Sequence, residues 1–336
     1  MNTMAILVAA AVAFAVSAIG GHFLIPFLRK LHFGQTILDI GPKWHKNKQG
    51  TPTMGGIMFI GGVLAAAAAG YLMLQFEGEN SQWQGTAVEN ARYWGTILLA
   101  LSYGFIGFID DYVKVAKKRN LGLTAGQKLV LQFVAAAVYL SVLYFAGDTS
   151  TIVIIPFLGQ LNLGMAYFPL CMVGIVYVTN SVNLTDGLDG LCGSVTTVAA
   201  LGFMAVSAVL GFAGINILST ALAAACLGFL IWNFYPAKVF MGDTGSMFLG
   251  GMIVGLAFGI GMPLILAFIG IIYITESLSV VLQVISFKTT GKRIFKMSPI
   301  HHHFELCGYT EVRIDFLFAA VTALGSLLAL LAVKML

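Results

Sequence analysis

The chain has 336 residues, of which 59% are hydrophobic and only 10% are charged, and its formal net charge at pH 7 is +4. Its mean hydropathy of +0.91 excludes an ordinary soluble globular domain. The composition therefore indicates an integral membrane protein.

Apolar windows of about 20 residues, the length that a helix needs to cross a bilayer, follow one another along the chain. Lipid offers the backbone no hydrogen-bond partners, and the two-residue alternation typical of barrel strands is absent, so these spans are predicted to be helices. We predict an all-α polytopic membrane protein with about ten transmembrane helices that form one transmembrane domain, residues 1–336. The windows lie near residues 4–28, 54–76, 93–112, 127–146, 168–184, 191–211, 216–233, 247–261, 264–287 and 316–335.

The positive charges gather on one side of this bundle. When the connections between windows are numbered from the N-terminus, 16 of the 18 Lys and Arg residues lie in or beside odd-numbered connections. Only Arg92 and Lys334 fall on the other side. The positive-inside rule then places the odd connections in the cytoplasm and both termini outside, which agrees with an even number of spans.

The first polar cluster, GTPTMGG, opens the second window and follows Lys48. Thr51 or Thr53 could cap the helix of that window, with Pro52 in its first turn. The paired glycines would allow close packing against another helix. As a lone motif, this cluster is weak.

The stretch GFIDDYVK ends the third window with two adjacent carboxylates. Neighbouring residues on a helix diverge by about 100°, and two like charges at this depth are costly without a cation. One interpretation is a salt bridge between Asp110 and Lys114, four residues apart. The other is a divalent cation bound by Asp110 and Asp111, with phosphate held by Lys114, Lys117 and Lys118.

The segment NSVNLTDGLDG spaces Asn180, Asn183, Asp186 and Asp189 three residues apart, which aligns them on one helix face as long as the helix lasts. Two carboxamides and two acids offer donors and acceptors that suit a nucleobase edge, ribose hydroxyls or a hydrated cation. The alternative is a polar helix end satisfied by the protein itself, although such clustering is expensive in a membrane.

MGDTGS precedes the eighth window. Gly242 and Gly245 would let a ligand approach the backbone closely, and Thr244 and Ser246 could cap the helix that follows. Helix N-termini attract phosphate, and Asp243 beside one would suit a bridging metal. A plain capped turn is the alternative interpretation.

PIHHHFE contains three consecutive histidines, His301, His302 and His303, whose rings must point in different directions. This spacing disfavours zinc. Beside neighbouring lysines and an arginine, the histidines form a cationic surface that could bind phosphate or move a proton, unless the loop is merely solvated. Glu276, inside the ninth window, is a separate intramembrane acid to which the sequence assigns no role.

All five clusters lie on odd connections or at span ends beside one, and therefore on the predicted cytoplasmic face. Acids able to hold magnesium, many cations and a glycine-flanked helix start fit phosphoryl transfer, whose catalysis consists chiefly of alignment and charge neutralisation. The position at the membrane surface suggests that one substrate is lipid-borne and that a soluble nucleotide arrives from the cytoplasm.

GTPTMGG, FIDDYVK, NSVNLTDGLDG, FMGDTGS and PIHHHFE together resemble, in order and over nearly the whole chain, the motifs of the phospho-N-acetylmuramoyl-pentapeptide transferases. PIHHHFE with TPTMGG is more specific than the acidic motifs shared across the wider polyprenyl-phosphate sugar-1-phosphate transferase superfamily. The resemblance implies a ten-helix, Mg²⁺-dependent enzyme of the bacterial inner membrane, with its active site facing the cytoplasm. Such an enzyme transfers phospho-MurNAc-pentapeptide from UDP-MurNAc-pentapeptide to undecaprenyl phosphate, giving lipid I and UMP for peptidoglycan synthesis.

The resemblance also implies roles for individual residues. It makes Asp110, Asp111, Asp243 and His301 catalytic, with the three aspartates as metal ligands and Asp243 as the leading one. Asp110 would bind or deprotonate the lipid phosphate. The substrate-binding residues that it implies are Lys48, Thr53, Lys114, Lys118, Asn180, Asn183, Asp186, Gly187, Leu188, Asp189, Asn233, Phe240, Gln283, His302 and His303.

Two alternatives remain open at the level of sequence. A sister enzyme that uses UDP-GlcNAc would share the acidic motifs but should lack PIHHHFE. An ion-coupled secondary transporter would place its acids at mid-membrane, whereas nearly all acids here lie at span ends. The expected partners are the two substrates and membrane lipids, with no nucleic acid, and a bundle of this size commonly packs as a homodimer.

Overall fold

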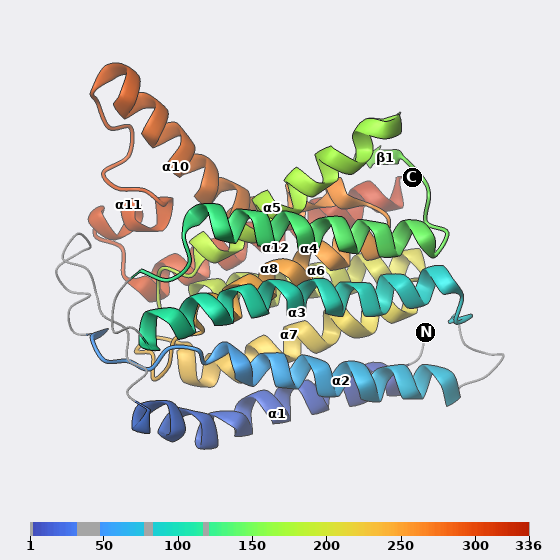
Figure 1. Cartoon of the computed structure of the whole chain (residues 1–336), viewed down its shortest axis with the longest axis horizontal. Helices are drawn as coiled ribbons and strands as arrows, with labels where there is room; N and C mark the ends of the chain where they lie inside the picture. The colour runs from blue at the N-terminus through green and yellow to red at the C-terminus, as the bar shows by residue number, and fades with distance from the viewer. Residues whose placement is uncertain (1–2, 32–47, 77–82, 117–120, 336) are drawn as a thin grey trace.

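The structure, a computed structural model, describes residues 3–31, 48–76, 83–116 and 121–335 and is a bundle of long helices (Figure 1). The predicted all-α class is confirmed. The long helices are α1 (Thr3–Lys30), α2 (Gly56–Phe76), α3 (Ala87–Ala116), α4 (Ala125–Phe145), α5 (Tyr167–Thr185), α6 (Leu191–Leu210), α7 (Ala213–Asn233), α8 (Gly242–Gly259), α10 (Ile271–Thr290) and α12 (Glu311–Lys334).

Nine of the described helices, all of these except α8, are long and apolar enough to cross a membrane. Helix α8 also has the length of a span, 18 residues, but its first turn is polar because it carries Asp243 and Thr244. Helix α1 begins and α12 ends at the same end of the bundle (Figure 1). An even number of crossings fits that arrangement, so a tenth crossing by α8 stays a prediction beside the nine candidate spans.

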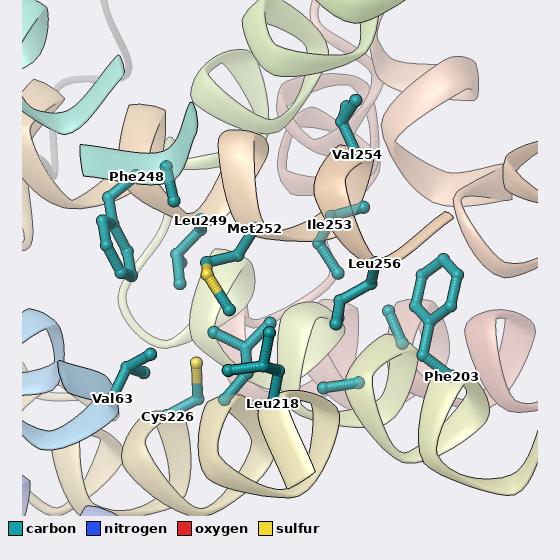
Figure 2. Packing of buried hydrophobic residues seen from close by; sticks show 14 of the residues in the cluster. Val63, Phe203, Leu218, Cys226, Phe248, Leu249, Met252, Ile253, Val254 and Leu256 are labelled. Atoms are coloured by element: carbon teal, nitrogen blue, oxygen red, sulfur yellow. The ribbon is translucent and has the colours of Figure 1, made fainter. Parts of the chain in front are cut away.

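Helix α8 forms the centre of the bundle. All its residues from Thr244 to Gly259 are buried, which explains why the apolar residues of this segment occupy every face of the helix. Leu249 and Met252 of α8 point toward Leu218 and Cys226 of α7 (Figure 2). The central helix therefore carries its polar first turn on a scaffold that is held from all sides.

Helices α3 and α8 cross in direct backbone contact. A Cβ placed on Gly251 would lie 2.6 Å from the Cα of Ala100, and one placed on Gly255 would lie 2.6 Å from a side-chain carbon of Thr96. Small residues at such positions let helices approach closely enough for van der Waals packing to hold them together in a membrane. This close packing fixes the ends of α3 and α8 relative to one another.

The remaining elements are short. The connection from α4 to α5 contains the antiparallel strands β1 (Ile152–Ile155) and β2 (Gly159–Asn162), followed by the 3₁₀ helix η3 (Gly164–Ala166). The ninth predicted window is broken at Gly270, where the 3₁₀ helix η4 (Pro263–Ile265) and α9 (Leu266–Ile269) precede α10. Helix α11 (Ile300–Leu306) contains the three histidines and lies below the outward-leaning end of α10 (Figure 1), with His301 in contact with Glu276 in the first half of that helix.

Candidate active site

Three carboxylates from two helices meet at one end of the bundle. Asp110 and Asp111 lie near the end of α3, and Asp243 lies in the first turn of α8. One oxygen from each carboxylate lies within 4.8 Å of the others. The contact is this close because Gly107, one turn before Asp111, leaves room for the backbone of Asp243 and Thr244.

Asp111 caps helix α8 from a different helix. Its Oδ2 accepts hydrogen bonds from the Thr244 N–H at 2.9 Å and the Thr244 hydroxyl at 2.7 Å, and its Oδ1 accepts from the Asp243 N–H at 3.3 Å. The predicted capping by Thr244 and Ser246 is therefore wrong, since Ser246 instead donates to the Gly242 carbonyl. The backbone N–H groups at the start of α8, which were expected to attract phosphate, therefore donate to a carboxylate of the protein itself.

Asp110 and Asp243 share two lysines. The Lys114 ammonium lies 2.6 Å from Asp110 Oδ2 and 2.9 Å from Asp243 Oδ2, and the Lys128 ammonium lies 3.2 Å and 2.8 Å from the same two oxygens. Asp110 Oδ1 also accepts the Leu123 N–H at 2.8 Å. The predicted bridge between Asp110 and Lys114 is correct, but it belongs to a larger network, which we call the carboxylate–lysine cluster.

The carboxylate–lysine cluster is suited to a divalent cation. Asp110 and Asp111 are 2% and 4% exposed and Asp243 is 20% exposed, so one carboxylate opens toward solvent. Three carboxylates against two ammonium groups leave an excess of negative charge, which a buried site must offset. All the donors are carboxylate oxygens, the ligands that hard cations such as Mg²⁺ prefer. The donor set therefore fits a divalent metal.

The four polar residues of NSVNLTDGLDG have different partners. Asn180 exchanges hydrogen bonds with Gln132, while Asn183 donates to Asp243 Oδ1 at 3.0 Å. Helix α5 ends at Thr185, so the common face predicted for all four residues stops there. Asp186, the next residue, is partly buried. Burial raises the pKa of its carboxyl well above the ordinary value, and the nearby carboxylates of Asp243, Asp111 and Asp189 raise it further.

Asp189 belongs to a second charged cluster, formed with Lys48 and Glu311. The Lys48 ammonium lies 2.7 Å from Asp189 Oδ1 and 2.6 Å from Glu311 Oε2, and the Asp189 N–H donates to the same Glu311 oxygen. Burial of the ammonium opposes its charged form, but the two carboxylates outweigh burial and raise the pKa of Lys48 above its ordinary value. We call this group the Lys48 cluster.

The segments around the two clusters are joined through the backbone. The Phe240 N–H donates to the Pro52 carbonyl at 2.8 Å, and the Phe240 carbonyl accepts the Gly55 N–H at 2.8 Å. Gly242 has a φ of +71°, and a Cβ there would lie 2.7 Å from the Thr53 hydroxyl. Thr53 therefore packs at the start of α8 rather than capping α2, which begins at Gly56.

Asn233 and Leu188 complete this region. Asn233 donates to the Val239 carbonyl at 2.9 Å and accepts the Gly190 N–H at 3.2 Å, so its amide holds two turns together. Leu188, which immediately precedes Asp189 in the chain, is also buried. Both side chains stabilise the turn that follows α5.

The three histidines have three different partners, as their adjacency predicts. His301 Nδ1 lies 3.0 Å from Glu276 Oε1, His302 Nδ1 lies 2.6 Å from Glu305 Oε2, and His303 Nδ1 accepts the Lys296 N–H at 3.2 Å. Gln283 is bonded to the backbone of residues 294 and 295. Gln283 thus supports the loop that leads to α11.

Comparison with known proteins identifies the family. Residues 93–261 match the model of glycosyl transferase family 4, and residues 48–60 match signature 1 of phospho-N-acetylmuramoyl-pentapeptide transferase. The chain is 45% identical over 325 residues to the phospho-N-acetylmuramoyl-pentapeptide transferase of Clostridium perfringens (strain SM101 / Type A), covering 96% of this chain and 95% of the relative. It is 44% identical over 335 residues to the enzyme of that name from Bacillus mycoides (strain KBAB4), covering 99% and 98%.

The chain belongs to the phospho-N-acetylmuramoyl-pentapeptide transferase family. The family predicted from the motifs is therefore confirmed, and with it the predicted enzyme class, a transferase, over the transporter alternative. Both family matches include parts of the site, because the signature begins at Lys48 and the family 4 match spans the three aspartates.

Of the site residues expected for this family, Asp110, Asp111, Asp243 and Lys114 lie in the carboxylate–lysine cluster, and Lys48 and Asp189 lie in the Lys48 cluster. Lys118 lies outside the described residues. Sequence reasoning missed Lys128 and Glu311 as members of the clusters. A signal existed for Lys128, which is a lone cation at the start of an apolar window, but Glu311 resembles an ordinary acid in the first turn of a helix.

Proposed function

We propose that this protein transfers phospho-MurNAc-pentapeptide from UDP-MurNAc-pentapeptide to undecaprenyl phosphate, giving lipid I and UMP in peptidoglycan synthesis. Membership of the family supports this reaction. The observation that carries the proposal is the carboxylate–lysine cluster, in which Asp110, Asp111 and Asp243 meet between Lys114 and Lys128. Such a combination can bind a metal and neutralise phosphate oxygens at the same point.

The metal is proposed to be Mg²⁺, held by Asp110, Asp111 and Asp243, with Asp243 as the leading ligand. Asp243 is the most exposed of the three and approaches from a different helix, which suits a cation that also binds substrate phosphate. When bound, Mg²⁺ would neutralise charge on the pyrophosphate oxygens and so favour departure of UMP.

The reaction is proposed to be a single displacement. An oxygen of undecaprenyl phosphate attacks the sugar-linked phosphorus of the donor, a new P–O bond forms, and the bond from that phosphorus to the bridging oxygen breaks as UMP leaves. The lipid phosphate is already a competent nucleophile, so positioning matters more than activation. Asp110 would orient the lipid phosphate, while Lys114 and Lys128 would move from their carboxylate partners to the phosphate oxygens.

The nucleotide is proposed to bind along the turn that follows α5. In that arrangement, the Lys48 cluster, Asn233 and Phe240 would surround the uridine, and Asn183 would approach the pyrophosphate because it already contacts Asp243. The remaining substrate-binding assignments, Thr53, Lys118, Asn180, Asp186, Gly187, Leu188, Gln283, His302 and His303, stay predictions, as does the catalytic role of His301.

The active site is proposed to face the cytoplasm from the bacterial inner membrane. The distribution of 16 of 18 cations on one side supports this orientation. The placement lets UDP-MurNAc-pentapeptide arrive from the cytoplasm while undecaprenyl phosphate enters from the bilayer. A homodimer stays a prediction, which the mass of the purified protein in detergent would test.

The test is UMP release by purified protein supplied with both substrates, with and without Mg²⁺. We expect release only when both substrates and Mg²⁺ are present. Equal release with UDP-GlcNAc as donor would contradict the proposed substrate and favour the sister activity. Ion or solute transport in liposomes without any UMP release would contradict the reaction itself.

Asp243→Asn and Asp110→Asn should each lower turnover by at least about 100-fold, because each removes a negative charge from the reacting centre. Both variants should retain the thermal unfolding midpoint of a folded protein. Rates near that of the unaltered protein in either variant would exclude the assigned role.

A further inference from the structure

A buried carboxylate and imidazole form a pair beside the turn that follows α5. Glu276 of α10 is 0% exposed and His301 of α11 is 1% exposed, and His301 Nδ1 lies 3.0 Å from Glu276 Oε1. Placing two such groups inside a membrane protein is expensive, so intramembrane acids with a partner commonly mark a functional site. Sequence motifs alone assign Glu276 no role.

The second nitrogen of this imidazole faces the turn. His301 Nε2 is buried and has no hydrogen-bond partner among the residues that the structure describes. A Cβ on Gly187 would come within 3.0 Å of Nε2, so the imidazole edge lies directly against the backbone at that residue. Buried polar atoms are nearly always paired, so an unpaired one such as Nε2 is available to accept a hydrogen bond from a bound molecule.

Gly187 lies between the two charged clusters. Asn183, four residues earlier and in the last turn of α5, donates to Asp243. Asp189, two residues later, is bonded to Lys48. The residue against which His301 Nε2 packs therefore belongs to the same short segment as the residues that contact the two clusters.

The carboxylate determines which nitrogen of His301 carries the proton. A neutral imidazole has one N–H and one lone pair, and a carboxylate beside Nδ1 favours the form in which Nδ1 donates and Nε2 accepts. The same arrangement fixes the orientation of histidines that bind metals, where a carboxylate holds the ring from behind. Glu276 therefore controls both the direction and the hydrogen-bonding character of Nε2.

We propose that Glu276 is a positioning residue that, through His301, presents the Nε2 lone pair beside Gly187 to a hydroxyl or N–H group of the nucleotide-sugar donor. This inference rests on the proposed function for the identity of the donor. Glu276 itself touches no substrate, and it acts by holding the imidazole.

The first test replaces Glu276 by methionine, which fills a similar volume without an acceptor. We expect the KM for UDP-MurNAc-pentapeptide to rise about 10-fold or more, as for other carboxylates that orient a histidine, while the KM for undecaprenyl phosphate stays unchanged. Ser277→Ala is the matched control, because Ser277 is also buried on α10 but bonds Tyr177, and it should leave both KM values unchanged. Equal increases in both KM values for Glu276→Met would overturn the proposal.

A second test asks whether Glu276 acts through His301. Glu276→Met in a His301→Gln background should have no further effect on the donor KM, because residues that act as a unit are not additive. Gly187→Ala, whose methyl group would displace the imidazole from the other side, should raise the donor KM in the same way. The Gly187→Ala variant also tests the contact between Gly187 and the His301 imidazole if the Glu276→Met variant fails to fold. Full additivity, or a Gly187→Ala variant with an unchanged donor KM, would contradict the proposal.

The protonation of His301 can be measured without any activity. In protein labelled with ¹⁵N-histidine, the His301 signals are those lost in His301→Gln. We expect a protonated Nδ1 in the unaltered protein and a shift toward the Nε2–H form in Glu276→Met. An unchanged spectrum would refute the positioning role even if UMP is released, whereas an absence of UMP release with the expected spectrum would refute only the proposed reaction.

Discussion

Replacing Gly107 by alanine should disrupt the point where α3 and α8 meet. A Cβ at this position would lie 2.7 Å from the Thr244 nitrogen and closer still to the carbonyl of Asp243, whereas ordinary van der Waals contact begins at 3.4 Å. All the obstructing atoms belong to backbone, so no side chain can rotate away. The two helices must therefore separate by at least 0.7 Å at the Thr244 nitrogen, the difference between 3.4 and 2.7 Å.

The cost of that separation follows from two effects. Forcing a methyl group into a packed interface typically destabilises a protein by about 1–3 kcal/mol. A displacement approaching 1 Å among reacting groups can also reduce a rate by about 100-fold. We therefore expect Gly107→Ala to lower the rate of UMP release by one to two orders of magnitude while the protein remains folded.

The control is Gly174→Ala in α5, where nothing lies within 4 Å of the new methyl group. That variant should keep full activity and gain slightly in stability, because alanine is the better helix former. The measurements are UMP release at saturating substrates and the thermal unfolding midpoint in detergent. A Gly107→Ala variant with more than half of the original rate would refute the inference that this contact positions the carboxylates.

Three further predictions concern the lysines and their partners. Lys128→Met should lower turnover by about 100-fold, because it removes one of two ammonium groups from the carboxylates, whereas Lys238→Met at the exposed Lys238 should retain normal turnover. Glu311→Gln should raise the KM for the nucleotide donor and lower the free energy of unfolding by about 1–3 kcal/mol, because the Lys48 ammonium and the Asp189 N–H both lose a charged acceptor; unchanged values would contradict that role. The pKa of Lys48 is raised above 10.5, so its bridge stabilises the folded state at every pH below that value and is lost as pH rises through the folded-state pKa. The difference in unfolding midpoint between the unaltered protein and Lys48→Met should accordingly be constant between about pH 7 and 9 and shrink above about pH 10.5; a difference that is lost below pH 9 would contradict this assignment.

The helices could be predicted because each one needs a long apolar segment, and that requirement is visible in any single window. Their ends could not be predicted as well. Helix α3 spans Ala87–Ala116 where the sequence predicted 93–112, since its last turns are polar and stabilised by Asp110, Lys114 and their partners rather than by lipid. A hydropathy pattern does not contain that information.

The meeting of Asp110, Asp111 and Asp243 could also be predicted, because costly acids at span ends on one side of a membrane favour a shared cation. The individual hydrogen bonds could not. Asp111 caps a helix whose first turn lies more than 130 positions away in the sequence, while local rules pointed to Thr244 and Ser246. Helix α8 is apolar on every face, so its sequence gave no indication of which side α3 would occupy.

The end of α5 and the turn after it contact the carboxylate–lysine cluster, the Lys48 cluster and His301. Within residues 183–189, Asn183 bonds Asp243, Gly187 contacts His301 and Asp189 bonds Lys48. Seven consecutive residues cannot shift at one end without strain at the other, because the first three are helical and the last is held through Asp189 by both Lys48 and Glu311. A nucleotide sugar that displaced Lys48 from Asp189 would therefore also change the position of Asn183 beside Asp243. In the proposed binding mode, binding of the donor at one cluster and alignment of the carboxylates at the other would thus be coupled through a single short segment of the chain.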